Sequence, residues 1–246
     1  MEGIAPYARL TKIRMKIFCN RPSHLTSQYI WLKKMSNILL EACVETYEQA
    51  VLAERRGAHR IELCAHLEHG GLTPETDLIR NLLQILKIPI KVMVRPRPGN
   101  FVYTPAEIEQ MAQKIILFKE MGISEIVLGV LDENGAVHLK QLQYLAEIAS
   151  PLAITFHKAI DETTNPLLEL NRMAGLPQNI QSILTSGKQP TARQGHTLLQ
   201  TMIKRFGNRF TIVAAGRVTD VNLKELHQLI GAREYHGRKI VGNLEG

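Results

Sequence analysis

A carboxylate and a thiol occur two residues apart at two places in the chain, as Glu41 with Cys43 and as Glu62 with Cys64. Each pair ends a short apolar run that predicts a strand. Because side chains alternate along a strand, the two members of a pair point in the same direction. Thiolates bind soft metal ions and carboxylates move protons, so the repeat indicates a metal site, an acid–base site, or both.

Other predicted strands also end in polar residues, notably Arg95, His157 and, shortly after, Asp161. We expect His157 or a glutamate to act as acid or base while Arg95 holds an anionic group. The candidate catalytic residues are therefore Glu41, Glu62, Arg95, His157 and Asp161. The candidate substrate-binding residues follow later strands, where many barrels bind phosphate nearby, and are Thr185, Ser186, Gly187, Gly216 and His236.

Eight short strand-like runs alternate with amphipathic stretches after residue 37. The runs are Ile38–Cys43, Arg60–Cys64, Ile90–Arg95, Glu125–Leu131, Leu152–His157, Ser182–Gly187, Phe210–Gly216 and Glu234–Gly237. Helix starts are predicted at Thr46, at Thr73-Pro74, at the capping box Thr104 to Glu107, and at Thr219 or Asp220. This alternation predicts an α/β fold, a (β/α)8 TIM barrel whose strands all point the polar residues to one mouth. An open doubly wound sheet is the alternative, but no glycine fingerprint follows the first run.

Too few residues follow the eighth run to form a full helix, so the barrel is expected to lack its last helix. The outer faces of the first and eighth strands then need another cover, because parallel strands are buried on both faces. We expect either the segment Thr26–Met35 or a second subunit to provide it, which favours a homo-oligomer.

The net charge of +7 is concentrated at the N-terminus. Residues 1–36 hold seven Lys/Arg and one acidic residue, which leaves +1 on the rest of the chain. We therefore expect a basic extension over residues 1–36, a barrel domain over 37–246, and no nucleic-acid partner. The extension could be a targeting peptide, but a natural start at Met35 is the favoured interpretation. No apolar run is long enough to cross a membrane.

The cysteines and glutamates also have structural interpretations. Three cysteines, with Cys19 the third, suit a reducing compartment better than a disulfide scaffold. Cys43 and Cys64 could simply pack in the core, and Glu41 or Glu62 could pair with Arg95 to neutralise a buried charge. If the thiols bind a metal, Cu(I) fits best, because zinc usually has four ligands.

Several segments in succession resemble the CutC copper homeostasis proteins. They are LEACVET, GAHRIELCAHLEHGGLTP, VMVRPRPGNFVYT, LGVLDENGAVH, PLAITFHKAID, ILTSG and EYHG, and they run from about Ile38 to His236. The resemblance implies a cytoplasmic TIM barrel that self-associates and binds Cu(I), with Cys43 and Cys64 at the positions proposed as copper ligands. The chain departs from the family after the seventh strand, where Arg217 would add an anion contact beside Gly216.

Two functions remain open at this point. The first is copper handling by Cys43 and Cys64. The second is an enzyme that acts on a small anionic or phosphorylated metabolite, because the polar cluster around Arg95 and His157 exceeds what a copper site requires.

Overall fold

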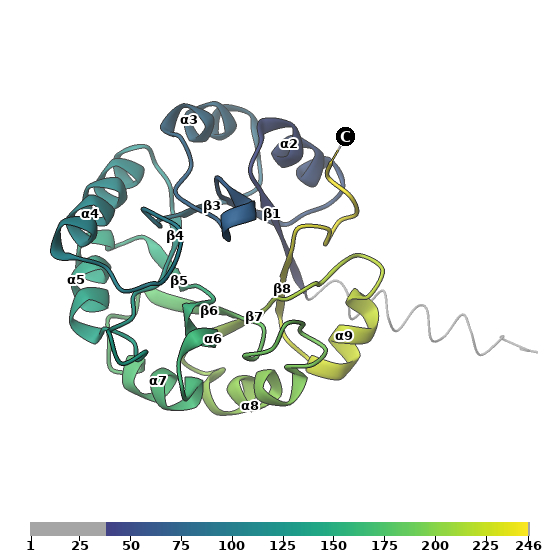
Figure 1. Ribbon diagram of the computed structural model, residues 1–246. Coiled ribbons are helices and arrows are strands. Elements are labelled where there is room, and N and C mark those ends of the chain that lie inside the picture. Colours follow the sequence, from purple (N-terminus) through teal and green to yellow (C-terminus); the bar gives the residue numbers. More distant parts are fainter. Residues whose placement is uncertain (1–37, 246) are drawn as a thin grey trace, which may run out of the picture. The chain divides into compact units, whose positions relative to one another are not determined.

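The computed structural model describes residues 38–245, and these residues form a closed barrel of parallel strands in the order β1 to β8. The strands are β1 (Leu39–Val44), β2 (Arg60–Leu63), β3 (Ile90–Met93), β4 (Glu125–Leu128), β5 (Ala153–Phe156), β6 (Ile180–Thr185), β7 (Thr211–Ala214) and β8 (Glu234–Gly237). Figure 1 looks along the barrel axis and shows the strands as an inner ring. The predicted TIM barrel is confirmed. The predicted basic extension, residues 1–36, and the predicted cover, Thr26–Met35, lie outside the described residues.

Helices surround this ring and connect successive strands. They are α2 (Tyr47–Arg55), α3 (Thr76–Ile85), α4 (Pro105–Glu120), α5 (Leu139–Ala149), α6 (Ala159–Glu162), α7 (Pro166–Met173), α8 (His196–Phe206) and α9 (Leu223–Ile230), with a 3-10 turn, η1 (Leu67–His69), after β2. Apolar residues of strands and helices pack between the two rings, as the fully buried Ile61, Ile79 and Leu82 show. This rigid core fixes the strand ends that carry the polar residues.

Two helix starts were predicted correctly. Thr46 caps α2 by accepting a hydrogen bond from the Gln49 N–H. The capping box of α4 is complete, since Thr104 Oγ1 accepts from the Glu107 N–H and Glu107 Oε2 accepts from the Thr104 N–H at 2.8 Å. Such caps satisfy N–H groups that the first turn leaves free.

The other two predicted starts were early by about a turn or less. The α3 helix begins at Thr76, because Thr73 Oγ1 instead donates to the Arg95 carbonyl oxygen at 3.0 Å and accepts from the Arg95 N–H at 2.8 Å. Thr73 therefore joins two loops at the mouth of the barrel. The α9 helix begins at Leu223, and Thr219 belongs to the preceding turn.

Within the described residues, no helix follows β8, as predicted. Residues 238–245 fold back past α2, where Arg56 donates to the Asn243 carbonyl oxygen. Ile240 and Leu244 of this tail are buried. On β8, the Tyr235 side chain is fully buried and its hydroxyl accepts from the Ala232 N–H. The outer face of β1 and β8 is thus covered by this tail despite the missing helix.

Candidate metal and ligand site at the barrel mouth

A layer of paired charges fills the interior of the barrel below the mouth. Glu41 Oε2 lies 2.6 Å from Arg60 Nε and 3.0 Å from Lys91 Nζ, and Glu41 Oε1 lies 2.9 Å from His236 Nδ1. Arg60 also contacts Glu234 at 2.6 Å and Glu125 at 3.6 Å. Each charge therefore has a partner, which buried charges require.

Glu41 is committed to this network. Burial alone would raise its pKa, but Lys91, a hydrogen bond with His236, and Arg60 together hold the pKa well below its usual range. The carboxylate is therefore ionised and structurally engaged. The hypothesis that Glu41 pairs with Arg95 is wrong, because its partners come from β2, β3 and β8.

Sequence analysis missed four members of this layer: Arg60, Lys91, Glu125 and Glu234. The available signal was alternation. Arg60 lies two positions before Glu62, and Lys91 lies four positions before Arg95, so each shares the inward direction of a residue that was selected. Lys91 is fully buried and also donates to Thr155 Oγ1 at 2.8 Å.

The two thiols meet at the top of this layer. Ligand atoms of Cys43, Glu62 and Cys64 all lie within 4.8 Å of one another, and all three residues are buried. The register explains this, because Cys43 on β1 stands opposite Glu62 on β2. Both cysteines are free, and Cys64 Sγ donates to Glu62 Oε1 at 3.4 Å.

Apolar side chains pack against one side of the thiols. Cys43 and Cys64 pack in one cluster with Met93 and Val127, and Leu67 of η1 covers it. The cysteines therefore do pack in the core, as one interpretation of the sequence expected. Two neighbouring thiols beside apolar side chains also suit a soft ion, so the two interpretations are compatible.

The proton equilibria of the thiols are linked. The neighbouring Cys64 thiol is the main cause that lowers the pKa of Cys43, and His236 adds to it against the effect of burial. The same Cys43 contact and burial raise the pKa of Cys64. One thiolate is thus favoured at Cys43, and a thiolate is the form that binds metals.

His236 and Glu62 form the polar side of the thiol site. Burial lowers the pKa of His236, but Glu62, Cys43 and Glu41 outweigh it and hold the pKa well above its usual value. Burial is the main cause that raises the pKa of Glu62 to about 7. Glu62 Oε2 accepts no hydrogen bond from a described residue. Glu41, Glu62 and His236 form a second group whose ligand atoms lie within 4.8 Å of one another.

Arg95 serves a different purpose from the predicted anion clamp. Its Nη1 donates to the carbonyl oxygens of His69 and Gly71, at 3.0 and 3.1 Å, and its Nη2 donates to that of Gly99 at 2.8 Å. The guanidinium also lies over the Phe101 ring, 4.8 Å from its centroid. These contacts hold the loops after β2 and β3 together.

The His157 ring packs against the same phenylalanine, with ring centroids 4.6 Å apart. Its Nδ1 accepts from the Ala159 N–H at 3.1 Å, and its buried Nε2 has no partner among the described residues. Burial, with Arg95 nearby, lowers the pKa of His157 to about 3. His157 is therefore neutral at physiological pH and belongs with Arg95, away from Glu41.

Asp161 is engaged by the loop after β6. Its carboxylate accepts from Thr185 Oγ1, from the Ser186 N–H at 2.9 Å, from Ser186 Oγ at 3.0 Å, and from the Lys188 N–H at 2.8 Å. The predicted substrate-binding residues Thr185 and Ser186 thus fix this loop. Close packing explains the glycines, since a Cβ on Gly187 would lie 2.4 Å from the Gly195 carbonyl oxygen and one on Gly216 would lie 2.8 Å from Ser186 Cβ.

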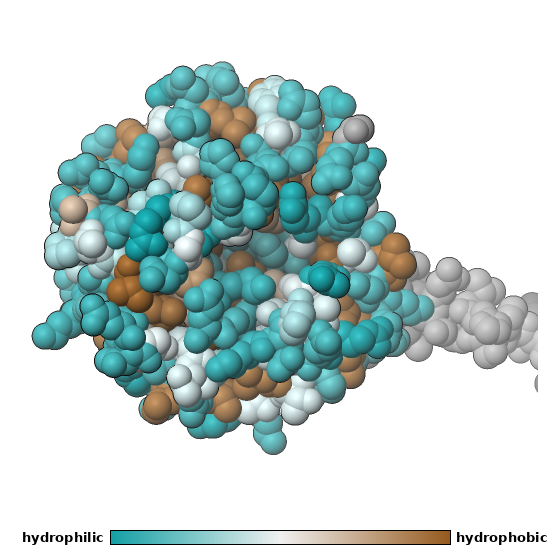
Figure 2. Space-filling view, in the orientation of Figure 1, coloured by the Kyte–Doolittle hydropathy of each residue, from teal (hydrophilic) through white to brown (hydrophobic). Residues whose placement is uncertain are grey.

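A cavity of about 520 Å³ opens above the thiols. Its lining comes from the loops after β5, β7 and β8 and from η1, and it includes Cys43 and His236. Figure 2 shows this face of the protein hollowed at its centre and bordered mainly by hydrophilic side chains. Of the predicted site residues, Cys43, Gly216 and His236 line the cavity, whereas Arg95, His157 and Asp161 do not.

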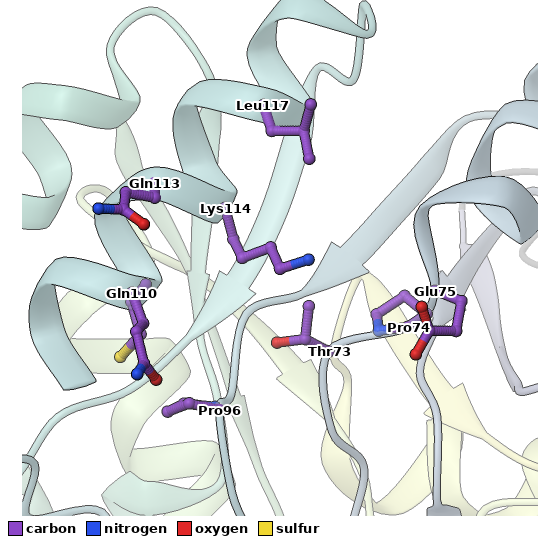
Figure 3. A pocket seen from close by; sticks show the side chains of 9 residues that line it. Thr73, Pro74, Glu75, Pro96, Gln110, Gln113, Lys114 and Leu117 are labelled. Carbon is purple, nitrogen blue, oxygen red and sulfur yellow. The ribbon is translucent and has the colours of Figure 1, made fainter.

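A second hollow, of about 490 Å³, lies outside the barrel between α4 and the segment that leads into α3. Lys114 points into it from α4, opposite Thr73 and Glu75 (Figure 3). None of the predicted site residues lines it. Among the described residues, no helix is long and apolar enough to cross a membrane.

Comparison with known proteins agrees with the motifs. The model of the CutC family matches residues 38–241. The human copper homeostasis protein cutC homolog is 38% identical over 201 residues, which are 82% of this chain and 73% of that protein. A CutC family protein of Proteus mirabilis is 38% identical over 199 residues, which are 78% of this chain and 79% of that protein.

Solved structures agree as well. The crystal structure of a CutC protein from Streptococcus agalactiae has a TM-score of 0.78 and 28% identity, and the match covers 82% of this chain and 99% of that one. A dihydrodipicolinate synthase from Bacillus anthracis, with a TM-score of 0.57 and 12% identity over 82% of this chain and 70% of that one, shares the fold. The family match, the identity to its members and the barrel lead to one conclusion: this chain belongs to the CutC family.

Proposed function

We propose that this protein handles copper by binding Cu(I) through the thiolates of Cys43 and Cys64. The observation that supports this is the pair of free, buried thiols that adjacent strands bring together. The lowered pKa of Cys43 favours a thiolate, and Met93 and Val127 pack against the two thiols. Two soft donors in such a pocket select Cu(I) over ions that prefer oxygen ligands.

Residues next to the thiols would tune the site. His236 and Cys43 both line the cavity, and Glu62 accepts a hydrogen bond from the Cys64 thiol. Metal binding displaces thiol protons, and Glu62, whose pKa is raised to about 7, is placed to take up the proton of Cys64. Zinc is a poorer fit, because a structural zinc site is usually bound by four protein ligands and only two thiols are present here.

The proposal includes a compartment and an assembly state. Cu(I) and free thiols persist in a reducing compartment, so we expect the protein in the cytoplasm. We also expect self-association, as the resemblance to the family implies. Size-exclusion chromatography with light scattering would test the assembly state, and a monomer at micromolar concentration would contradict it.

The test of copper binding is a competition titration with a chromophoric Cu(I) chelator under anaerobic conditions. The Cys43→Ser/Cys64→Ser double variant should lose the high-affinity copper that the wild type takes from the chelator. Cys19→Ser, the same chemical change at the third cysteine, is the matched control and should bind like the wild type. Equal stoichiometry and affinity in the double variant would overturn the proposal.

A further inference from the structure

Four cations line the cavity above the thiols, and copper binding does not use them. Lys158 follows β5, Arg217 follows β7, and Arg238 and Lys239 follow β8. Among the described residues that line the cavity, none is acidic. Three separate loops therefore bring positive charge to one opening.

The described part of the protein compensates these four charges only weakly, since the carboxylates that interact with them are Glu162 near Lys158 and Glu45 near Arg238. The side chains of Lys158, Arg217 and Lys239 make no hydrogen bond or ion pair with a described residue, and Arg238 comes only within 4.0 Å of Glu45. Arginines elsewhere are engaged, as Arg60 and Arg95 show. Uncompensated like charges repel one another, so an anion in the cavity would relieve an unfavourable energy.

The backbone after β7 also presents donors. Gly216 and Arg217 both have left-handed backbone angles, with φ of 103° and 56°. Their N–H groups donate to no described residue. Arg217 is not a glycine, so this conformation is strained, and Asn222 Nδ2 holds it by donating to the Arg217 carbonyl oxygen at 2.8 Å. Successive N–H groups that are left free in a turn form concavities that bind anions.

We propose that this cavity binds a small phosphate monoester, with the phosphate between the loops after β5, β7 and β8. The position agrees with the phosphate sites that TIM barrels form after their seventh and eighth strands. The cavity is larger than an inorganic ion needs, and Leu67, Ala215 and Val218 give it an apolar part for the carbon skeleton. His236 and Cys43 lie on the lining, so the ligand and the thiols share one opening.

The outer groove of Figure 3 has no such character. It carries one lysine, Lys114, and one carboxylate, Glu75, so its formal charges cancel. Lys114 therefore serves as a control for lysines that line the mouth.

Isothermal titration calorimetry with glycerol 3-phosphate tests the proposal at physiological ionic strength, with glycerol and sulfate as comparison ligands. The wild type should bind glycerol 3-phosphate and not glycerol, and it should bind sulfate more weakly. The Lys158→Gln/Lys239→Gln variant should weaken binding by about 10-fold or more, since it removes two of the four charges. Arg217→Gly should weaken it as well, and it relieves the strained backbone, so loss of folding would not explain the effect.

The control Lys114→Gln should leave the affinity unchanged. Cys64→Ser, which removes a proposed copper ligand that does not line the cavity, should also retain binding, so the failure of copper binding and the failure of this proposal are distinguishable. The proposal would be overturned if the wild type gave no heat of binding at about 10 mM ligand, a concentration above the weak end of metabolite affinities. Equal affinity in the lysine variants and the wild type, or equal affinity for sulfate and the ester, would also overturn it.

Discussion

Nδ1 of His236 lies 2.9 Å from Oε1 of Glu41, and this contact connects the charged layer inside the barrel with the thiols at its mouth. Glu41 also contacts Lys91 and Arg60, so one carboxylate orients the imidazole and pairs with two buried cations. The glutamate that first appeared to be a companion of Cys43 is thus a support for the residues around it.

The first prediction concerns Lys91, whose ammonium is fully buried between Glu41 and Thr155. Lys91→Met keeps most of the side-chain volume but leaves Glu41 with one partner fewer. The free energy of unfolding should fall by about 3 kcal/mol, because removing one member of a buried ion pair leaves the other charge buried without its partner. Urea unfolding followed by circular dichroism measures this.

Arg80→Gln is the control, because its partner Asp77 is 88% exposed and surface pairs contribute little. Its effect should stay below about 0.5 kcal/mol. In the double variant Lys91→Met/Glu41→Gln the losses should be less than additive. A Lys91→Met effect as small as that of Arg80→Gln would show that the buried pair is not important for stability.

The second prediction concerns the proton equilibrium of His157. Its pKa falls from 6.5 to about 3 on folding, so the unfolded chain binds more protons between these values. Stability is therefore fully present above pH 6.5 and is lost as the pH falls toward 3, by up to about 1.4 kcal/mol for each pH unit. NMR should show a neutral ring with the proton on Nε2 at pH 5, and titration near 6.5 in urea.

His157→Gln should make the stability less dependent on pH between 6.5 and 4, because the titrating group is gone. A His157 resonance that titrates near pH 6.5 in the folded protein would contradict the buried, neutral state.

The third prediction concerns Arg95, which donates to three backbone carbonyl oxygens in two loops. A lysine cannot reproduce the forked geometry. Arg95→Lys should therefore increase hydrogen exchange in residues 66–72 and 97–101 and lower stability by about 2 kcal/mol. Mass spectrometry of exchanged peptides measures this, with peptides of α8 as the internal reference. Exchange that rises equally in α8 and in the loops would mean that the arginine acts on the whole fold.

The barrel could be predicted from the sequence because its signals are local. Strand runs and helix caps such as Thr104 with Glu107 lie within a few residues of each other. The thiol pair also followed from alternation along β1 and β2. The start of α3 could not be predicted, because Thr73 bonds to Arg95, which is distant in sequence.

The partners of the buried charges could not be predicted for the same reason. Glu41 or Glu62 was considered as a partner for Arg95, but the closed barrel places Arg60, Lys91 and His236 around Glu41. The pairing of these buried charges across five strands depends on the register and shear of the barrel. A local pattern of residues does not predict either quantity. Of the four cations that line the mouth, Arg217 was expected as an anion contact, whereas Lys158, Arg238 and Lys239 were not.

X-ray absorption spectroscopy of the Cu(I)-loaded protein tests the central claim most directly, because it identifies the atoms bound to copper. The wild type and Cys19→Ser should show copper bound by two sulfur atoms, and Cys43→Ser/Cys64→Ser should lose this signal. Copper bound only by nitrogen or oxygen in the wild type, or an unchanged sulfur signal in the double variant, would contradict the assignment of Cys43 and Cys64 as the copper ligands.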